Sequence, residues 1–154
     1  MTEPLCATLI ERYLCTRGRR YFRGQHDGEF FFVTDAHPQR LHVHLEISPA
    51  HPEVFAIRVA PACFFPAGDR ALLARFADRW NTQRRGVTAI VHNSSDPQRI
   101  GVTAYKSQWI AGPVDFSEFA VFVDRAIGAS IELFGELNRV AELPQTPPLM
   151  RDVG

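Results

Sequence analysis

The sequence lacks an excess of charge of either sign. Its 154 residues contain 17 lysines and arginines against 17 aspartates and glutamates. Domains that bind nucleic acid mainly through phosphate usually carry a clear basic excess, so this balance disfavours nucleic acid as a partner. No stretch approaches the ~20 apolar residues of a membrane helix, and the first residues lack the basic and apolar character of a secretory signal. We therefore expect a cytoplasmic protein that has no membrane partner.

Cysteine is scarce, and the usual catalytic motifs are missing. Cys6, Cys15 and Cys63 cannot all pair within one chain, and none belongs to a C-x-x-C arrangement. A reducing compartment is the simplest interpretation. The sequence also lacks a Gly-x-Ser-x-Gly elbow, a phosphate-binding glycine loop and a dinucleotide fingerprint. We therefore expect a non-enzymatic protein with no cofactor.

What remains is the composition of an ordinary globular chain, with 45% hydrophobic and 22% charged residues. Its length favours a single domain, which we place at residues 1–143. From Pro144 onward the sequence is rich in proline and cannot continue a helix. We therefore predict a flexible C-terminal tail over residues 144–154.

Hydrophobic periodicity predicts three helices separated by strands. Asp115 and Glu118 are spaced like a capping box before the longest apolar helical stripe, and Thr2 and Asp69 are candidate caps for the other two helices. Residues 41–48 alternate apolar and polar without interruption, which is typical of a half-buried strand. The predicted helices cover about 5–14, 70–85 and 116–137, and the predicted strands 29–34, 41–48, 54–60, 87–93 and 100–110.

The predicted order is α-β-β-β-α-β-β-α, which favours a single α+β domain. Short connections between successive strands favour antiparallel pairing. We expect one five-stranded antiparallel sheet with helices mainly on one face.

This order resembles the YbjN-like family, whose fold is that of type III secretion chaperones. The resemblance covers roughly residues 5–142 and includes the final long helix. Its most specific part is the Trp80-Asn81 pair, followed by basic residues and the strand Val87-Thr88-Ala89-Ile90-Val91. It implies a small cytoplasmic chaperone or regulator that binds an extended segment of a client protein and is commonly a homodimer.

The outer face of the predicted sheet is a candidate surface for such a peptide. If the apolar positions of residues 41–48 face the helices, their polar neighbours face outward together with aromatic rings of other strands. Rings supply contact area, and imidazoles and hydroxyls supply adaptable polar contacts. The alternative is that a dimer partner or a helix covers this face. The predicted peptide contacts are Phe31, His42, His44, Tyr105 and Trp109.

A second apolar surface lies on the predicted helix over residues 70–85. Phe76 and Trp80 lie one turn apart, so a ring that the chain's own core does not need could anchor a homodimer. The alternative is that both rings belong to the core.

His42, His44 and Glu46 suggest a different function, because they occupy alternate positions on one strand and point to one face. Imidazole and carboxylate are ligands for zinc or iron, so a small metal-dependent enzyme or metal-binding protein is the first alternative. Three ligands along one straight strand rarely converge on one ion, so a solvated strand face explains the pattern equally.

Arg17, Arg19, Arg20 and Arg23 suggest a further alternative. They flank Tyr21 and Phe22, and arginines interleaved with aromatic rings occur on RNA-binding surfaces. An RNA-associated module is therefore the second alternative. The same cluster also fits the cationic end of a helix, where it would complement the helix dipole.

Overall fold

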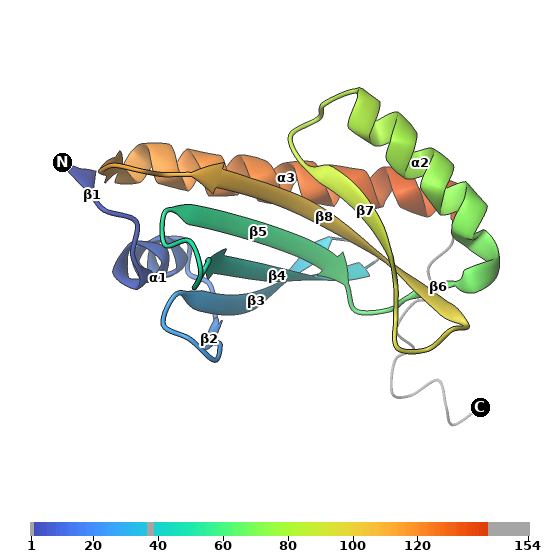
Figure 1. Cartoon of the computed structure of the whole chain (residues 1–154), viewed down its shortest axis with the longest axis horizontal. Helices are drawn as coiled ribbons and strands as arrows, with labels where there is room; N and C mark the ends of the chain where they lie inside the picture. The colour runs from blue at the N-terminus through green and yellow to red at the C-terminus, as the bar shows by residue number, and fades with distance from the viewer. Residues whose placement is uncertain (1, 37–38, 142–154) are drawn as a thin grey trace.

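An antiparallel sheet of strands with alternating side chains forms the framework of the molecule. The computed structural model describes residues 2–36 and 39–141 (Figure 1). Its main sheet has the order β2-β3-β4-β5-β8, and both β6 and β7 pair with β8. All of these pairings are antiparallel. The longer strands are β3 (Glu29–Ala36), β4 (Gln39–Ile47), β5 (Val54–Pro61), β7 (Thr88–Asn93) and β8 (Arg99–Trp109).

The five predicted strands and the α+β class are confirmed, and the structure adds short strands. β2 (Phe22–Arg23) extends the sheet beside β3, and β6 (Phe65–Pro66) pairs with the start of β8. A separate pair joins β1 (Thr2–Glu3) to β9 (Val114–Asp115). Two-residue strands carry no periodicity, so alternation could not predict them.

The three predicted helices are present as α1 (Ala7–Thr16), α2 (Arg70–Thr82) and α3 (Phe116–Val140), with a short 3-10 helix, η1 (Ala67–Asp69), leading into α2. Asp115 caps α3 as predicted, since its side chain accepts a hydrogen bond from the Glu118 N–H at 3.3 Å. Asp69 stands at the N-cap of α2, but its side chain makes no capping bond. The prediction for Thr2 is wrong, because this residue pairs in β1 and Cys6 occupies the N-cap of α1.

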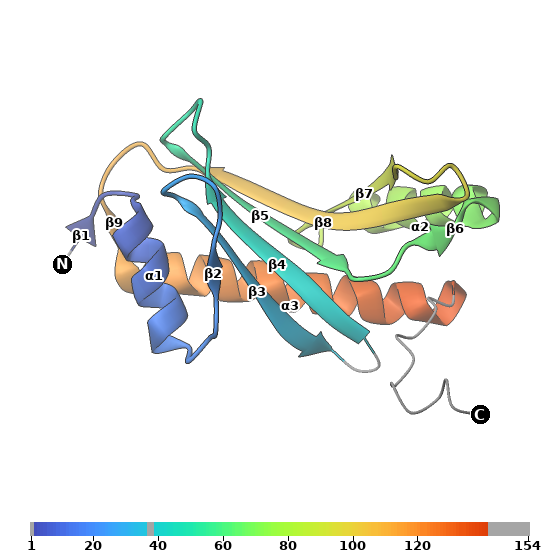
Figure 2. The same ribbon diagram turned by 90° about the horizontal axis from the view of Figure 1, so that it is seen from below.

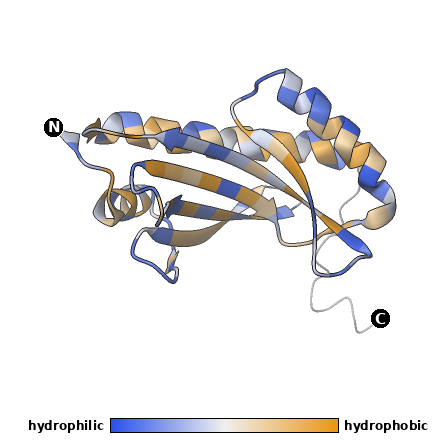
Figure 3. Cartoon of the chain, in the orientation of Figure 1, coloured by the Kyte–Doolittle hydropathy of each residue, from blue (hydrophilic) through white to orange (hydrophobic). Residues whose placement is uncertain are grey.

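One face of the sheet packs against helices. α3 runs the length of the sheet, with α1 near one end and α2 near the other (Figures 1 and 2). On β4, Leu41, Val43 and Leu45 are at most 1% exposed. Figure 3 shows polar positions interrupting the apolar ones along β4 and β5. The alternation that predicted these strands therefore separates a helix-covered face from an open one.

The Trp80-Asn81 pair joins α2 to β7. The Trp80 indole N–H donates to the Val87 carbonyl at 2.9 Å. The Asn81 amide bonds to both main-chain groups of Ala89, at 3.0 Å to its oxygen and 2.8 Å to its nitrogen. The side chain of Asn81 thus takes the place of a neighbouring strand at Ala89 and caps that position of the β7 edge.

The predicted tail over residues 144–154 lies outside the described residues. No helix of the described part of the chain has both the length and the apolar character needed to cross a membrane.

Candidate functional site

A row of side chains crosses the open face of the sheet from strand to strand. The pairing register places Phe22 opposite Phe31, Phe31 opposite His44, His44 opposite Arg58, and Arg58 opposite Tyr105. Directly opposed residues of an antiparallel pair share a face, so these five side chains form one line. We call it the transverse row.

Stacking between neighbours orders the transverse row. The Phe31 and His44 rings stack with centroids 4.6 Å apart and an interplanar angle of 23°. The Arg58 guanidinium lies 5.1 Å from the centre of the Tyr105 ring. Phe22 and Phe31 nevertheless remain 72% and 40% exposed. The row therefore presents apolar rings to solvent on a surface whose geometry is already fixed, which suits binding.

The structure brings together three of the five predicted peptide contacts. Phe31, His44 and Tyr105 belong to the transverse row, whereas His42 lies opposite Val33 in the adjacent row. Trp109 lies apart at the end of β8, where its indole N–H donates to Glu53 at 2.9 Å.

Sequence reasoning missed Phe22 and Arg58. Arg58 alternates with buried Ile57 and Val59, so the period of two could have placed it on the open face. Phe22 sits in a strand too short to show a period.

The structure corrects the expectation that Phe76 and Trp80 form a dimer contact. Phe76 is 8% exposed and Trp80 2% exposed, and their rings stack with centroids 6.3 Å apart inside the chain's own core. The Trp80 indole also donates a hydrogen bond to Val87 within the chain. Both rings therefore belong to the core, and neither is available to anchor a partner.

The predicted metal triad does not assemble either. The part of the chain that the structure describes has one convergent group of three possible ligands, and it consists of His26, Glu29 and Glu46. His44 instead bonds to Glu29, with Nε2 and Oε2 2.8 Å apart. His42 is exposed in the adjacent row. Alternate positions on one pleated strand are too far apart to converge, as the sequence had suggested.

Most arginines of the cluster bond to side chains of the same chain. Arg17 pairs with Asp124 at 2.7 Å, Arg23 pairs with Glu11 at 2.5 Å, and Arg19 donates to the Thr34 hydroxyl at 3.1 Å. The pKa of Glu11 lies below its usual value because Arg23 and then Tyr21 donate hydrogen bonds to its carboxylate. These arginines hold α1 against its surroundings, which weakens the RNA alternative.

A groove beside β8 adjoins the open face. β7 begins at Thr88, opposite Tyr105, so the described residues place no strand beside residues 106–109 on that side. The groove has a volume of about 610 Å³. Its walls come from β8 and α3 and include Lys106, Gln108, Val121, Phe122, Arg125 and Ala126. Sequence reasoning left the identity of the open edge undecided, because strand order is a tertiary property.

Neither a protein-family model nor a curated protein sequence matches this chain. Among solved structures, YbjN from E. coli, described as a proposed transcription regulator, is similar with a TM-score of 0.70 and 14% sequence identity. The alignment covers 91% of this chain and 96% of YbjN. An uncharacterised protein from Methanothermobacter thermautotrophicus has a TM-score of 0.54 and 13% identity, over 87% of this chain and 98% of the other. The chain therefore has a YbjN-like fold.

Proposed function

We propose that this protein is a non-enzymatic binding protein that holds an extended segment of another protein as an added strand beside β8. It would serve as a chaperone or regulator and turn over no substrate. The observation that carries the proposal is that β8 extends past the start of β7, above an apolar groove and next to the open face.

The main-chain groups of β8 support strand addition. The N–H and C=O of Ala89 both bond to the Asn81 side chain, so they point away from β8. Ala89 and its partner Ala104 in β8 are therefore a pair without mutual hydrogen bonds. Hydrogen-bonded and non-bonded pairs alternate along an antiparallel ladder. The N–H and C=O of Ser107 and Trp109 therefore face the side where β7 has ended. An extended segment could pair there through its own backbone.

The two sides of such a strand would meet different surfaces. Side chains on one side would enter the groove over Val121 and Phe122, while those on the other would lie near Tyr105 and Trp109 on the open face. Lys106 and Arg125 outnumber Glu118 at the groove, which favours an acidic residue in the client. The preferred client is thus a strand-forming segment with alternate apolar residues and an acidic group.

The similarity to YbjN supports this type of function only at the level of fold, and a regulatory role is compatible with it. We extend the proposal to a homodimer in the cytoplasm. Since Phe76 and Trp80 are internal, a second copy would need another surface, and the edge of β8 is one that two copies could pair through.

Site-specific photocrosslinking in cells would test the proposal. A benzophenone amino acid at Val121 should form defined crosslinks to a recurrent protein partner, whereas the same group at exposed Arg79 on α2 should not. A Ser107→Pro substitution removes an edge N–H that points away from β5, so it should abolish these crosslinks while leaving the sheet intact by circular dichroism.

Each result has a clear interpretation. Crosslinks between copies of the chain would favour the dimer. Crosslinking at Val121 no stronger than at Arg79, or undiminished by Ser107→Pro, would contradict strand addition beside β8.

A further inference from the structure

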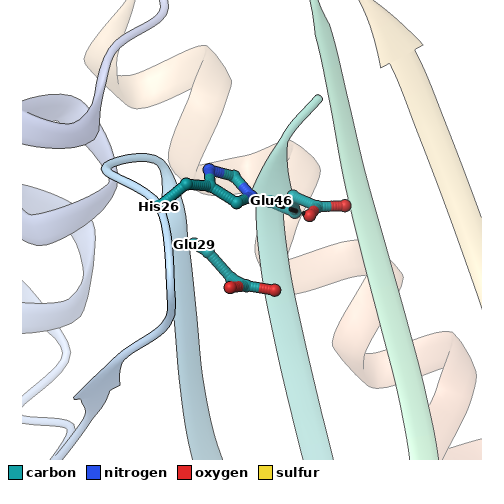
Figure 4. Close-up of side chains that lie close together, drawn as sticks. All are labelled: His26, Glu29 and Glu46. Carbon is teal, nitrogen blue, oxygen red and sulfur yellow. Dashed lines mark hydrogen bonds and ion pairs between the residues drawn. The ribbon is translucent and has the colours of Figure 1, made fainter. Parts of the chain in front are cut away.

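Three potential metal ligands from separate parts of the chain converge at one end of the open face. His26 belongs to the turn before β3, Glu29 begins β3, and Glu46 lies near the end of β4. Their side chains lie close together, with the His26 ring next to Glu46 (Figure 4). One ligand atom from each lies within 4.8 Å of the other two, and His26 Nε2 is 2.9 Å from Glu46 Oε2.

The turn over residues 24–28 is shaped around the Glu29 carboxylate. A Cβ on residue 24 would lie 2.1 Å from Glu29 Oε1, so only glycine fits at that position without moving the carboxylate. The next residue, Gln25, donates its backbone N–H to the same oxygen at 2.8 Å. This hydrogen bond, and then that of His44, hold the pKa of Glu29 below its usual value. The turn therefore holds the Glu29 carboxylate in place close to His26.

Outer contacts orient both carboxylates. His44 Nε2 lies 2.8 Å from Glu29 Oε2, and Arg58 donates to Glu46 Oε1 at 3.3 Å. The Oε2 atom of Glu46, which faces His26, is a different oxygen from the one that Arg58 contacts. Ligands supported by such outer hydrogen bonds are typical of metal sites.

The side chains are also neither fully buried nor free in solvent. Their exposed fractions are 32% for His26, 15% for Glu29 and 19% for Glu46. An ion could therefore reach them from solvent, while the surrounding strands limit their motion. Two carboxylates against one guanidinium leave a net negative charge when the imidazoles are neutral, which favours a cation.

We infer that His26, Glu29 and Glu46 bind one divalent transition-metal ion of the zinc type. Nitrogen and carboxylate oxygens at about 2.0–2.2 Å are usual zinc ligands, and three protein ligands leave a coordination position open. Small inward movements would replace the His26–Glu46 contact with two bonds to the metal. Water or a side chain of a bound partner could complete the coordination.

This inference is independent of strand addition beside β8. It also differs from the triad suggested by the sequence, because His42 has no part in it. His26 and His42 therefore form a matched pair of variants, one inside the cluster and one in an exposed position on the same strand as Glu46.

Isothermal titration calorimetry of the chelator-treated full chain with zinc chloride tests the site. The wild type should bind one equivalent saturably, and zinc should raise its melting temperature. His26→Ala and Glu46→Gln should each weaken binding at least about tenfold. His42→Ala should bind like the wild type. Urea unfolding without metal would verify that every variant is folded.

A variant outside the ligand set tests the outer contacts. Arg58→Gln removes the hydrogen bond that orients Glu46, so zinc should bind this variant more weakly than the wild type although all three ligands remain. Weak binding without saturation in the wild type, equal affinity in wild type and His26→Ala, or a loss confined to His42→Ala would each overturn the assignment.

Discussion

The two faces of the sheet come from the same strands but differ in chemistry. On β4, Leu41, Val43 and Leu45 are buried against the helices, whereas His42 is exposed and His44 is only partly covered. The buried side chains interlock in a single hydrophobic core. The open face instead holds rings, imidazoles and charges in a hydrogen-bonded arrangement. One face therefore stabilises the fold, which leaves the other free to acquire binding functions.

The edges of the sheet differ in the same way. At β7, Asn81 bonds to both main-chain groups of Ala89 and so blocks strand pairing at that position. At residues 106–109 of β8, no described strand pairs on the side where β7 has ended. Among the described residues, one side chain bonds to the main chain of this stretch: that of Gln108 donates to the Trp109 carbonyl at 3.3 Å. Unprotected edges are hazards for aggregation, and proteins usually cover them unless they serve pairing. The contrast between a capped and an uncapped edge supports strand addition beside β8.

The largest expected effect is a difference in stability between substitutions at two consecutive phenylalanines, which lie on opposite faces of β3. Phe32 is 1% exposed and Phe31 40% exposed. Phe32→Ala should lower the free energy of unfolding by about 3–5 kcal/mol, because it removes a buried ring and leaves a cavity. Phe31→Ala should cost about 1 kcal/mol or less, the order of one stacking contact.

Urea denaturation of both variants measures this difference directly. Equal losses of stability would show that a partner segment or an alternative packing covers the open face. A large loss for Phe31→Ala alone would reverse the assignment of the two faces.

A medium effect is expected at the capped edge. Asn81→Ala leaves the Ala89 N–H and C=O without their partners, which should cost about 1–3 kcal/mol. The exposed edge of β7 should also promote association at high concentration. Gln83→Ala, an exposed neighbour at the end of α2, is the control and should change stability by about 0.5 kcal/mol or less. Unfolding and light scattering test both parts, and unchanged values for Asn81→Ala would remove the capping role.

Local signals in the sequence were sufficient for the main elements. The alternation of residues 41–48 and the capping box at Asp115 depend on neighbours along the chain, and the structure contains both β4 and the predicted cap. Thr2 was misassigned because pairing with β9 competes with a helix cap, and that competitor lies more than a hundred residues away.

The site depended more on tertiary structure. Alternation placed His44 and Tyr105 on one face but could not show that their strands lie on either side of β5. His26 was missed because a turn, rather than a strand, carries it toward Glu46. For Trp80, helical spacing fitted both a core ring and a dimer anchor, and only the bond to Val87 distinguishes them.

The smallest expected effect is on acid unfolding. It compares two carboxylates, Asp124 on the helix side of the sheet and Glu29 on the open face. The Asp124 side chain on α3 is 44% exposed and contacts Tyr13 and Arg17, so solvent screens part of its ion pair. Burial raises the pKa of Asp124, but hydrogen bonds from Arg17 and Tyr13 lower it by more. The pKa therefore lies below its usual 3.8. On the open side, bonds from Gln25 and then His44 place the pKa of Glu29 below its usual 4.5. Both folded-state values are depressed, so each carboxylate stabilises the fold above its unfolded pKa.

That stabilisation should disappear as the pH falls through the folded pKa. Asp124→Asn and Glu29→Gln should each make the acid side of the stability curve shallower, by at most the slope of one proton, about 1.4 kcal/mol per pH unit. Urea midpoints between pH 6 and about pH 3 would measure the change, with exposed Asp78→Asn as the control. If the Glu29→Gln curve coincides with the wild type while Asp124→Asn is shallower, the Glu29 charge contributes nothing measurable to folding, unlike the Asp124 charge on the helix side.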